Sequence, residues 1–115
     1  MQRLFIYTKA FDRKLKDLKN HTEIEMHIEK ALLGDSEIGD LIEGTHGLRK
    51  FRFAYGSRGK SGGIRILYFD LKSVQKTYLI AFFHKNEKEN LSKEERNAIG
   101  QMILQIKKEA ERGNT

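Results

Sequence analysis

The chain has 115 residues, of which 38% are hydrophobic and 33% charged, so it is expected to form one small soluble domain over residues 1–115. It has no cysteine, which excludes disulfides, thiol nucleophiles and cysteine-based zinc sites. Its apolar runs are too short to span a membrane and it lacks the pattern of a signal peptide, so we expect a cytoplasmic protein that does not associate with membranes.

The net charge of +6 is concentrated in one segment. Residues 44–69 contain six basic residues and no acidic residue, whereas the other 16 basic residues of the chain equal its 16 acidic ones. Excess charge confined to about a fifth of the chain predicts a local anion-binding surface rather than a uniformly basic coat. Nucleic-acid phosphate is the first candidate ligand.

The first residues predict a strand followed by a helix. Residues 4–7 form a short β-rich run, and Thr8 directly after it is suited to cap the N-terminus of a helix. Apolar residues then recur at helical spacing among charged ones, which predicts an amphipathic helix containing Phe11, Leu15 and Leu18.

A second helix is expected next. Thr22 and Glu25 fit a capping box, which places the start of this helix at Thr22, and Gly34 is suited to end it. Residues 34–47 are rich in glycine and other turn-forming residues, and they predict a structured loop.

Three strand-like runs follow, over residues 48–55, 64–71 and 77–83. Their connections are too short for a crossover helix, so neighbouring strands are expected to be antiparallel. Ser92 and Glu95 form another capping box, before a final amphipathic helix. The predicted fold class is α+β: a four-stranded, mainly antiparallel sheet in the order βααβββα, with two N-terminal helices on one face and the C-terminal helix on the other.

The glycine-rich segment before the second of these strands is not a P-loop. Gly59-Lys60-Ser61 matches the end of the Walker A motif, but Ala54 stands where that motif needs glycine. A strand pattern also follows, instead of the helix whose N-terminus would hold the phosphate. The simpler interpretation is a hairpin loop whose Arg58 and Lys60 reach a phosphate backbone without fixed geometry.

The basic strand carries more information. Alternation places Phe51 and Phe53 toward the core and Lys50 and Arg52 on the opposite face. Arg65 in the next strand is expected near Arg52 or Ala54, so three cations converge without an acidic partner in the segment. This arrangement favours anion binding, although a solvated basic strand face would give the same pattern.

The histidines and carboxylates form no recognisable catalytic or metal-binding motif. No histidine spacing fits a metal site, and no Ser-His-Asp order or carboxylate cluster is present. His46 and His84 could reach a common site, since one precedes the basic strand and the other ends the last strand. An enzyme built on this sequence would therefore use cations to stabilise a phosphorane and to protonate a leaving oxygen.

Three segments carry a family resemblance: GTHGLRKFR at residues 44–52, GKSGGIRILY at 59–68 and YLIAFFHKNEKENL at 78–91. Together with the element order, they resemble the RelE/ParE superfamily of bacterial toxins, and most closely its HigB-like branch. The resemblance implies a type II toxin that cleaves mRNA in the ribosomal A site. Its implied partners are the ribosome with its mRNA and a cognate antitoxin, often of the helix-turn-helix type.

The resemblance also implies a set of site residues. Cations at matching positions form the active site in such toxins, and here these are Lys50, Arg52 and Arg65, with a further residue in the region of His84 and Lys85. The remaining cations of the basic segment are expected to bind RNA: Arg49, Arg58 and Lys60. We expect no cofactor and no metal ion.

Two other functions are compatible with the same sequence. One is a ParE-like toxin that poisons gyrase, which the three cations at the active-site positions argue against. The other is a non-enzymatic basic module that binds nucleic acid or only its antitoxin. Because one fold can carry all three functions, the choice depends on the site residues.

Overall fold

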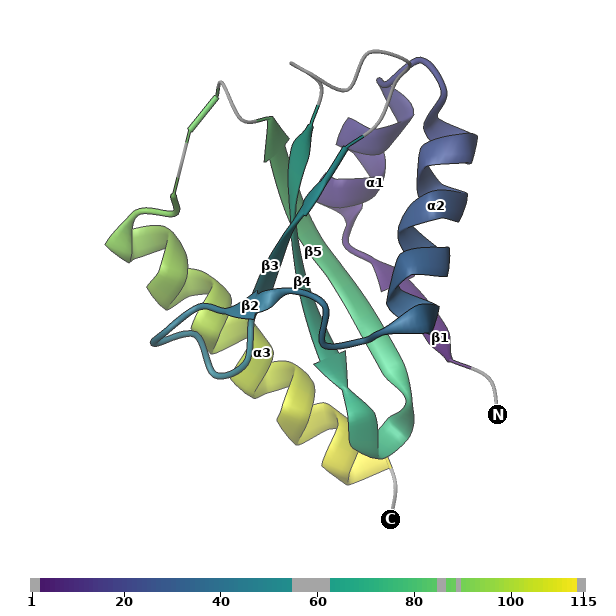
Figure 1. The fold of residues 1–115 in the computed structure, drawn as a ribbon. Helices are drawn as coiled ribbons and strands as arrows, with labels where there is room; N and C mark the ends of the chain where they lie inside the picture. Colours follow the sequence, from purple (N-terminus) through teal and green to yellow (C-terminus); the bar gives the residue numbers. More distant parts are fainter. Residues whose placement is uncertain (1–2, 55–62, 85–86, 89, 114–115) are drawn as a thin grey trace.

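The computed structural model describes residues 3–54, 63–84, 87–88 and 90–113. The α+β class is confirmed, with three helices and a five-stranded mixed sheet (Figure 1). In chain order the elements are β1 (Leu4–Tyr7), α1 (Lys9–Lys16), α2 (His21–Gly34), β2 (Asp40–Leu41), β3 (Arg49–Phe53), β4 (Ile64–Leu71), a 3-10 turn (Lys72–Val74), β5 (Lys76–His84) and α3 (Lys93–Gly113).

The strand order across the sheet is β1-β5-β4-β3-β2. The pairs β3–β4 and β4–β5 are antiparallel, as expected from their short connections, while β1 runs parallel to β5. The prediction of four strands is wrong, because Asp40 and Leu41 in the expected loop pair with β3 as a short fifth strand. Two residues give too little alternation to be recognised in the sequence, and this strand exists because the edge of β3 offers it a partner.

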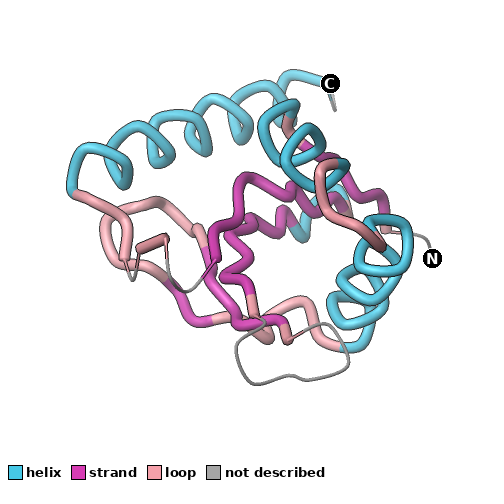
Figure 2. The backbone as a smooth tube through the Cα atoms, turned by 90° about the horizontal axis from the view of Figure 1, so that it is seen from above, coloured by secondary structure: helices cyan, strands magenta, loops and turns pink. Residues whose placement is uncertain are grey.

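Each face of the sheet has its own hydrophobic core. Helices α1 and α2 cover one face, where Phe11, Ile28 and Tyr68 are fully buried. Helix α3 crosses the other face, where Ile103 packs with Leu67 and its neighbours. Figure 2 shows the sheet between α3 on one side and the α1–α2 pair on the other. The predicted division of the helices between the two faces is therefore correct.

Two of the three predicted helix N-caps are present in the structure. Thr8 accepts a hydrogen bond from the Phe11 N–H at 3.1 Å and thus caps α1 as expected. At α3, the Ser92 and Glu95 side chains each accept from the other residue's N–H, at 3.1 and 2.8 Å, which confirms the capping box. The Thr22 capping box is wrong: α2 begins at His21, and its N-cap residue Asn20 makes no side-chain cap bond. Packing of its buried apolar face therefore fixes the start of α2.

No helix in the described ranges is long and apolar enough to cross a membrane. Helix α3 comes nearest in length, but charged residues occupy both of its ends and only Gly100 and Ile103 are buried.

Candidate nucleic-acid interface

The β3–β4 hairpin separates apolar from basic side chains. Phe51 is buried against Tyr68 in the core beneath α1 and α2, with ring centroids 5.6 Å apart. Phe53 packs at the margin of the same core. Because side chains alternate along a strand, Lys50 and Arg52 project from the opposite face, which is the face that α3 partly covers.

The register of the hairpin brings the predicted cations together. Arg52 lies directly opposite Arg65, and Lys50 lies opposite Leu67, which packs in the core beneath α3. Residues that pair across two strands share a face, so Lys50, Arg52 and Arg65 form one group, here called the cationic face. Arg52 is exposed and the other two are partly exposed. The prediction that Arg65 lies near Arg52 is confirmed.

The segment between β5 and α3 adds two residues that sequence reasoning missed. Asn90 Oδ1 lies 3.4 Å from Lys50 Nζ and accepts a hydrogen bond from it. The Lys88 ammonium lies 5.6 Å from the centre of the Phe83 ring, and Phe83 is the strand partner of Arg65. Lys88 also pairs with Glu95 at 2.5 Å. The only sequence signal for this arrangement was the capping box, which fixes where Glu95 lies.

Repulsion within the cationic face has no obvious internal compensation. Arg52 and Arg65 carry like charges in directly opposed positions, an arrangement that destabilises a sheet. Within the described part of the chain, neither arginine forms an ion pair or a side-chain hydrogen bond. Groups that repel one another in the free protein are stabilised when an anion binds between them.

Arg49 does not belong to this group. It shares the parity of Phe51 and its guanidinium reaches the loop before β2, where it donates to the Gly39 carbonyl at 2.6 Å and lies 4.0 Å from the Glu37 carboxylate. Lys72 also pairs with Glu37, and together the two cations lower the pKa of that carboxyl, the Lys72 hydrogen bond having the largest effect. Arg49 thus holds β2 and its loop in place.

The two candidate histidines lie apart from the cationic face and from each other. His84 pairs with Ile64, and its ring lies edge-on to Phe82 in the core beneath α1 and α2, with centroids 6.3 Å apart. His46 has a left-handed backbone with φ 62°, and its carbonyl accepts from Lys107 in α3 at 2.9 Å. The structure therefore does not bring them to a common site.

No protein-family model matches this sequence. Among solved structures, the chain is similar to two of E. coli toxin RelE. A double arginine mutant in the free state has a TM-score of 0.56 and 14% identity, covering 77% of this chain and 90% of that one. The isolated toxin has a TM-score of 0.54 and 11% identity, covering 88% of this chain and 99% of that one. The intact E. coli RelBE toxin-antitoxin complex matches with a TM-score of 0.55 and 12% identity, over 72% and 96% of the two chains.

The chain has the RelE-like toxin fold. At this low identity the RelE-like fold says nothing by itself about individual residues, so the site must be argued from the geometry above. Three of the predicted residues, Arg58, Lys60 and Lys85, lie outside the described residues. The described ranges contain no group of histidine and carboxylate side chains suited to hold a metal ion.

Proposed function

We propose that this protein is the toxin of a toxin-antitoxin pair and cleaves mRNA on the ribosome. The observation that carries the proposal is the direct opposition of Arg52 and Arg65, with Lys50 on the same face. Three cations at this spacing suit a phosphodiester that gains negative charge during reaction. The RelE-like fold, whose solved relatives include a toxin-antitoxin complex, supports the same conclusion.

The proposed chemistry is attack by the RNA's own 2′-OH. Its oxygen forms a bond to the adjacent phosphorus, the bond from phosphorus to the 5′-oxygen breaks, and the products are a 2′,3′-cyclic phosphate and a 5′-OH. The 2′-OH proton leaves to a base and the departing 5′-oxygen gains a proton, so no water or redox partner is consumed. The transition state carries additional charge on the phosphorane oxygens, and this is the charge that the cationic face is built to stabilise.

The register suggests a role for each cation. We assign phosphorane stabilisation to Arg65, because it lies at the centre of the sheet between β3 and β5. Arg52 opposite it binds the phosphate or assists the leaving oxygen. Lys50, which donates a hydrogen bond to Asn90, orients the 2′-OH or, as the neutral amine, accepts the proton of that group. Because these cations supply the positive charge, the cleavage step is proposed to need no metal ion.

The partners follow from the same proposal. The substrate is mRNA in the ribosomal A site, and the regulator is a cognate antitoxin, for which the helix-turn-helix type stays a prediction. The cytoplasm, where ribosomes and mRNA meet, is the corresponding location.

The test is a cell-free bacterial translation reaction in which mRNA 5′ ends are mapped by primer extension. Wild-type protein should produce cuts in phase with codons, and only when ribosomes are present. Arg65→Ala should abolish the cuts, whereas Arg13→Ala, which removes an exposed arginine of α1, should leave them unchanged. Intact mRNA with folded wild-type protein, or full cleavage by folded Arg65→Ala protein, would overturn the proposal.

A further inference from the structure

Strand β2 places a carboxylate beside the cationic face. Asp40 lies directly opposite Lys50 in the β2–β3 pairing, and residues paired in this way point to the same face of a sheet. Lys50 in turn lies opposite Leu67, whose side chain packs beneath α3. The Asp40 side chain therefore projects from the same face as Lys50, and the Cβ atoms of such a pair lie about 4.5–5.5 Å apart.

Backbone contacts on both sides of Asp40 hold this short strand in place. The Gly39 N–H donates to the Tyr68 hydroxyl at 3.0 Å, and the Gly39 carbonyl accepts from the Arg49 guanidinium at 2.6 Å. On the other side, the Ile42 N–H donates to a carbonyl of the segment that enters β3, at 2.9 Å. A two-residue strand at the edge of a sheet has few bonds of its own, so these contacts fix where the Asp40 carboxylate lies.

The Asp40 carboxylate is available for chemistry. It is exposed, and within the described ranges it forms no ion pair and accepts no side-chain hydrogen bond. Elsewhere in the same loop, Asp35 accepts from the Glu37 N–H at 3.0 Å, and Glu37 pairs with Lys72. A carboxylate next to an RNA-binding surface repels phosphate, so Asp40 weakens binding. RNA binding therefore does not explain a fixed carboxylate at this position, whereas proton transfer does.

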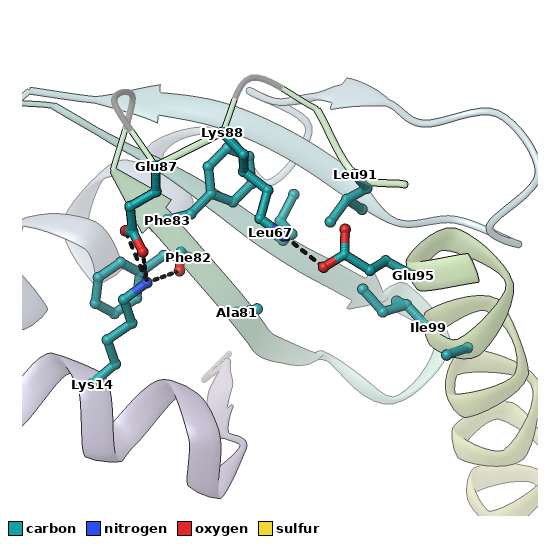
Figure 3. A pocket seen from close by; sticks show the side chains of 11 residues that line it. Lys14, Leu67, Ala81, Phe82, Phe83, Glu87, Lys88, Leu91, Glu95 and Ile99 are labelled. Atoms are coloured by element: carbon teal, nitrogen blue, oxygen red, sulfur yellow. Dashed lines mark hydrogen bonds and ion pairs between the residues drawn. The ribbon is translucent and has the colours of Figure 1, made fainter. Parts of the chain in front are cut away.

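The other neighbour of Lys50 is held equally firmly. Lys50 Nζ donates to Asn90 Oδ1 at 3.4 Å. The residue after Asn90 is Leu91, which is buried in the core beneath α3, and Lys88 pairs with Glu95 close to it (Figure 3). Asn90 thus directs the Lys50 amino group from the start of α3, on the same face as Asp40.

Lysine and aspartate suit different parts of the reaction. A lysine amino group is ordinarily charged at neutral pH, and an ammonium group has three donors and no lone pair that could accept a proton. An ionised carboxylate has only acceptors. On this face, Lys50 can therefore orient the attacking 2′-OH by donating to its oxygen, while Asp40 can take the proton of that group.

We propose that the Asp40 carboxylate is the general base of RNA cleavage. The 2′-OH proton passes to an Asp40 oxygen as the 2′-oxygen bonds to phosphorus and the bond from phosphorus to the 5′-oxygen breaks. The departing 5′-oxygen takes up a proton from solvent, and Asp40 later releases its own proton to solvent, so no proton is consumed. The inference rests on the proposed function and deepens it by naming the base.

The test measures single-turnover cleavage on ribosomes programmed with one mRNA, together with the affinity of the toxin for those ribosomes. Asp40→Asn keeps the shape of an exposed side chain, and circular dichroism verifies its fold. Its cleavage rate should fall about 100-fold or more, since general bases contribute factors of this size. Its affinity should be unchanged or higher, because a negative charge is lost. Asp40→Glu, which retains a carboxylate, should recover part of the rate.

Glu43→Gln is the matched control. It removes another exposed carboxylate three residues further along the chain and should leave both the cleavage rate and the affinity unchanged.

A second substrate identifies the proton that Asp40 handles. Replacing the 5′-oxygen at the cleavage site by sulfur gives a leaving group that departs without a proton. Asp40→Asn should be slowed to the same extent on this substrate, because the 2′-OH must still lose its proton. Recovery of its rate would overturn the proposal and assign Asp40 to the leaving oxygen.

The remaining outcomes separate this inference from the proposed function. Full cleavage by folded Asp40→Asn protein would overturn the role of Asp40 and leave the proposed function standing, since wild-type protein still cleaves. An equal loss in Glu43→Gln, or a loss of affinity in place of rate, would also overturn it, because the effect would then be one of charge or binding. Intact mRNA with wild-type protein would overturn both proposals.

Discussion

The two faces of the sheet make different use of the same alternating sequence. Beneath α1 and α2, the core extends from Phe11 to Tyr68 and even the basic Arg49 is bonded to the backbone. On the other face, α3 covers the part around Ile103, and the end of the β3–β4 hairpin carries the cationic face. One face is completed by packing, and the other keeps a charged region outside its core.

Neighbouring residues of like charge have unrelated roles in this sheet. Arg49 and Lys50 are adjacent in β3, yet the first holds a loop and the second faces Asn90 beside α3. The loop side is closely packed: a Cβ on Gly39 would lie 2.9 Å from the Lys50 carbonyl oxygen and 3.0 Å from the Tyr68 ring. Glycine is required there by close approach, and this contact positions β3 for both faces.

The largest expected effect comes from substituting one arginine on each face and comparing the two variants. Arg65→Ala should reduce cleavage about 100- to 1,000-fold, because one charge donor to the transition state is lost, and should leave stability almost unchanged. Arg49→Ala should do the reverse: it should lower the free energy of unfolding by about 1 kcal/mol, since it removes a charge-assisted hydrogen bond at a partly exposed site. Single-turnover cleavage and urea unfolding measure the two quantities. Equal losses of cleavage in both variants would show that the faces are not functionally distinct.

A second prediction sharpens the account of the packed face. The Tyr68 hydroxyl is buried, donates to the Ser36 carbonyl at 2.9 Å and accepts from the Gly39 N–H at 3.0 Å. Burial is the main reason that its pKa is raised. Tyr68→Phe leaves the Gly39 N–H without this acceptor and should cost about 1–3 kcal/mol in urea unfolding. Tyr78→Phe, at a more exposed tyrosine, is the control and should change stability far less; an equal loss there would argue against the role of the Tyr68 hydroxyl.

Sequence reasoning succeeded where local pattern decides structure. The bounds of β4 were predicted as residues 64–71 and are Ile64–Leu71, because its ends are marked by glycine and polar residues. The grouping of Lys50, Arg52 and Arg65 followed from alternation and a short hairpin, and the register agrees. In both cases the information lies within a few residues of the feature itself.

Sequence reasoning failed where contacts between residues far apart in the chain determine the structure. Strand β2 depends on pairing with β3, and the position of Lys88 depends on its pairing with Glu95, so neither leaves a local pattern. The bulge at Ile80 is the clearest case. Ile80 and Ala81 both pack beneath α3, which reverses the alternation and sends His84 to the face away from Arg65. One inserted residue thus separates a candidate residue from the cationic face.

A smaller predicted effect tests whether repulsion within the cationic face lowers the free energy of unfolding. Arg52→Gln removes one of two directly opposed like charges, so the free energy of unfolding should rise by about 0.2–1 kcal/mol while RNA cleavage falls. The gain should shrink in high salt, since screening already reduces the repulsion of wild-type protein. Urea unfolding at low and high salt measures it. If Arg52→Gln is instead less stable than wild-type protein at both salt concentrations, Arg52 stabilises the fold and the proposed repulsion is absent.

The smallest expected effect concerns Glu87, which accepts a hydrogen bond from the His84 N–H at 2.7 Å and pairs with Lys14 at 3.0 Å. Glu87 is ordinarily expected to titrate near 4.5, and its pKa is lowered in the folded protein by the His84 N–H and by Lys14. A carboxyl with a lowered folded pKa contributes stability above its ordinary pKa, and this contribution is lost as the pH falls through the lowered value. Wild-type protein should therefore lose the contribution of this carboxylate on acidification below about pH 4.5, whereas Glu87→Gln should show a shallower decline over the same range. Glu94→Gln removes an exposed carboxylate from α3 and serves as the control. If the stability of wild-type and Glu87→Gln protein declines identically on acidification, Glu87 does not keep its contacts with Lys14 and the His84 N–H in solution.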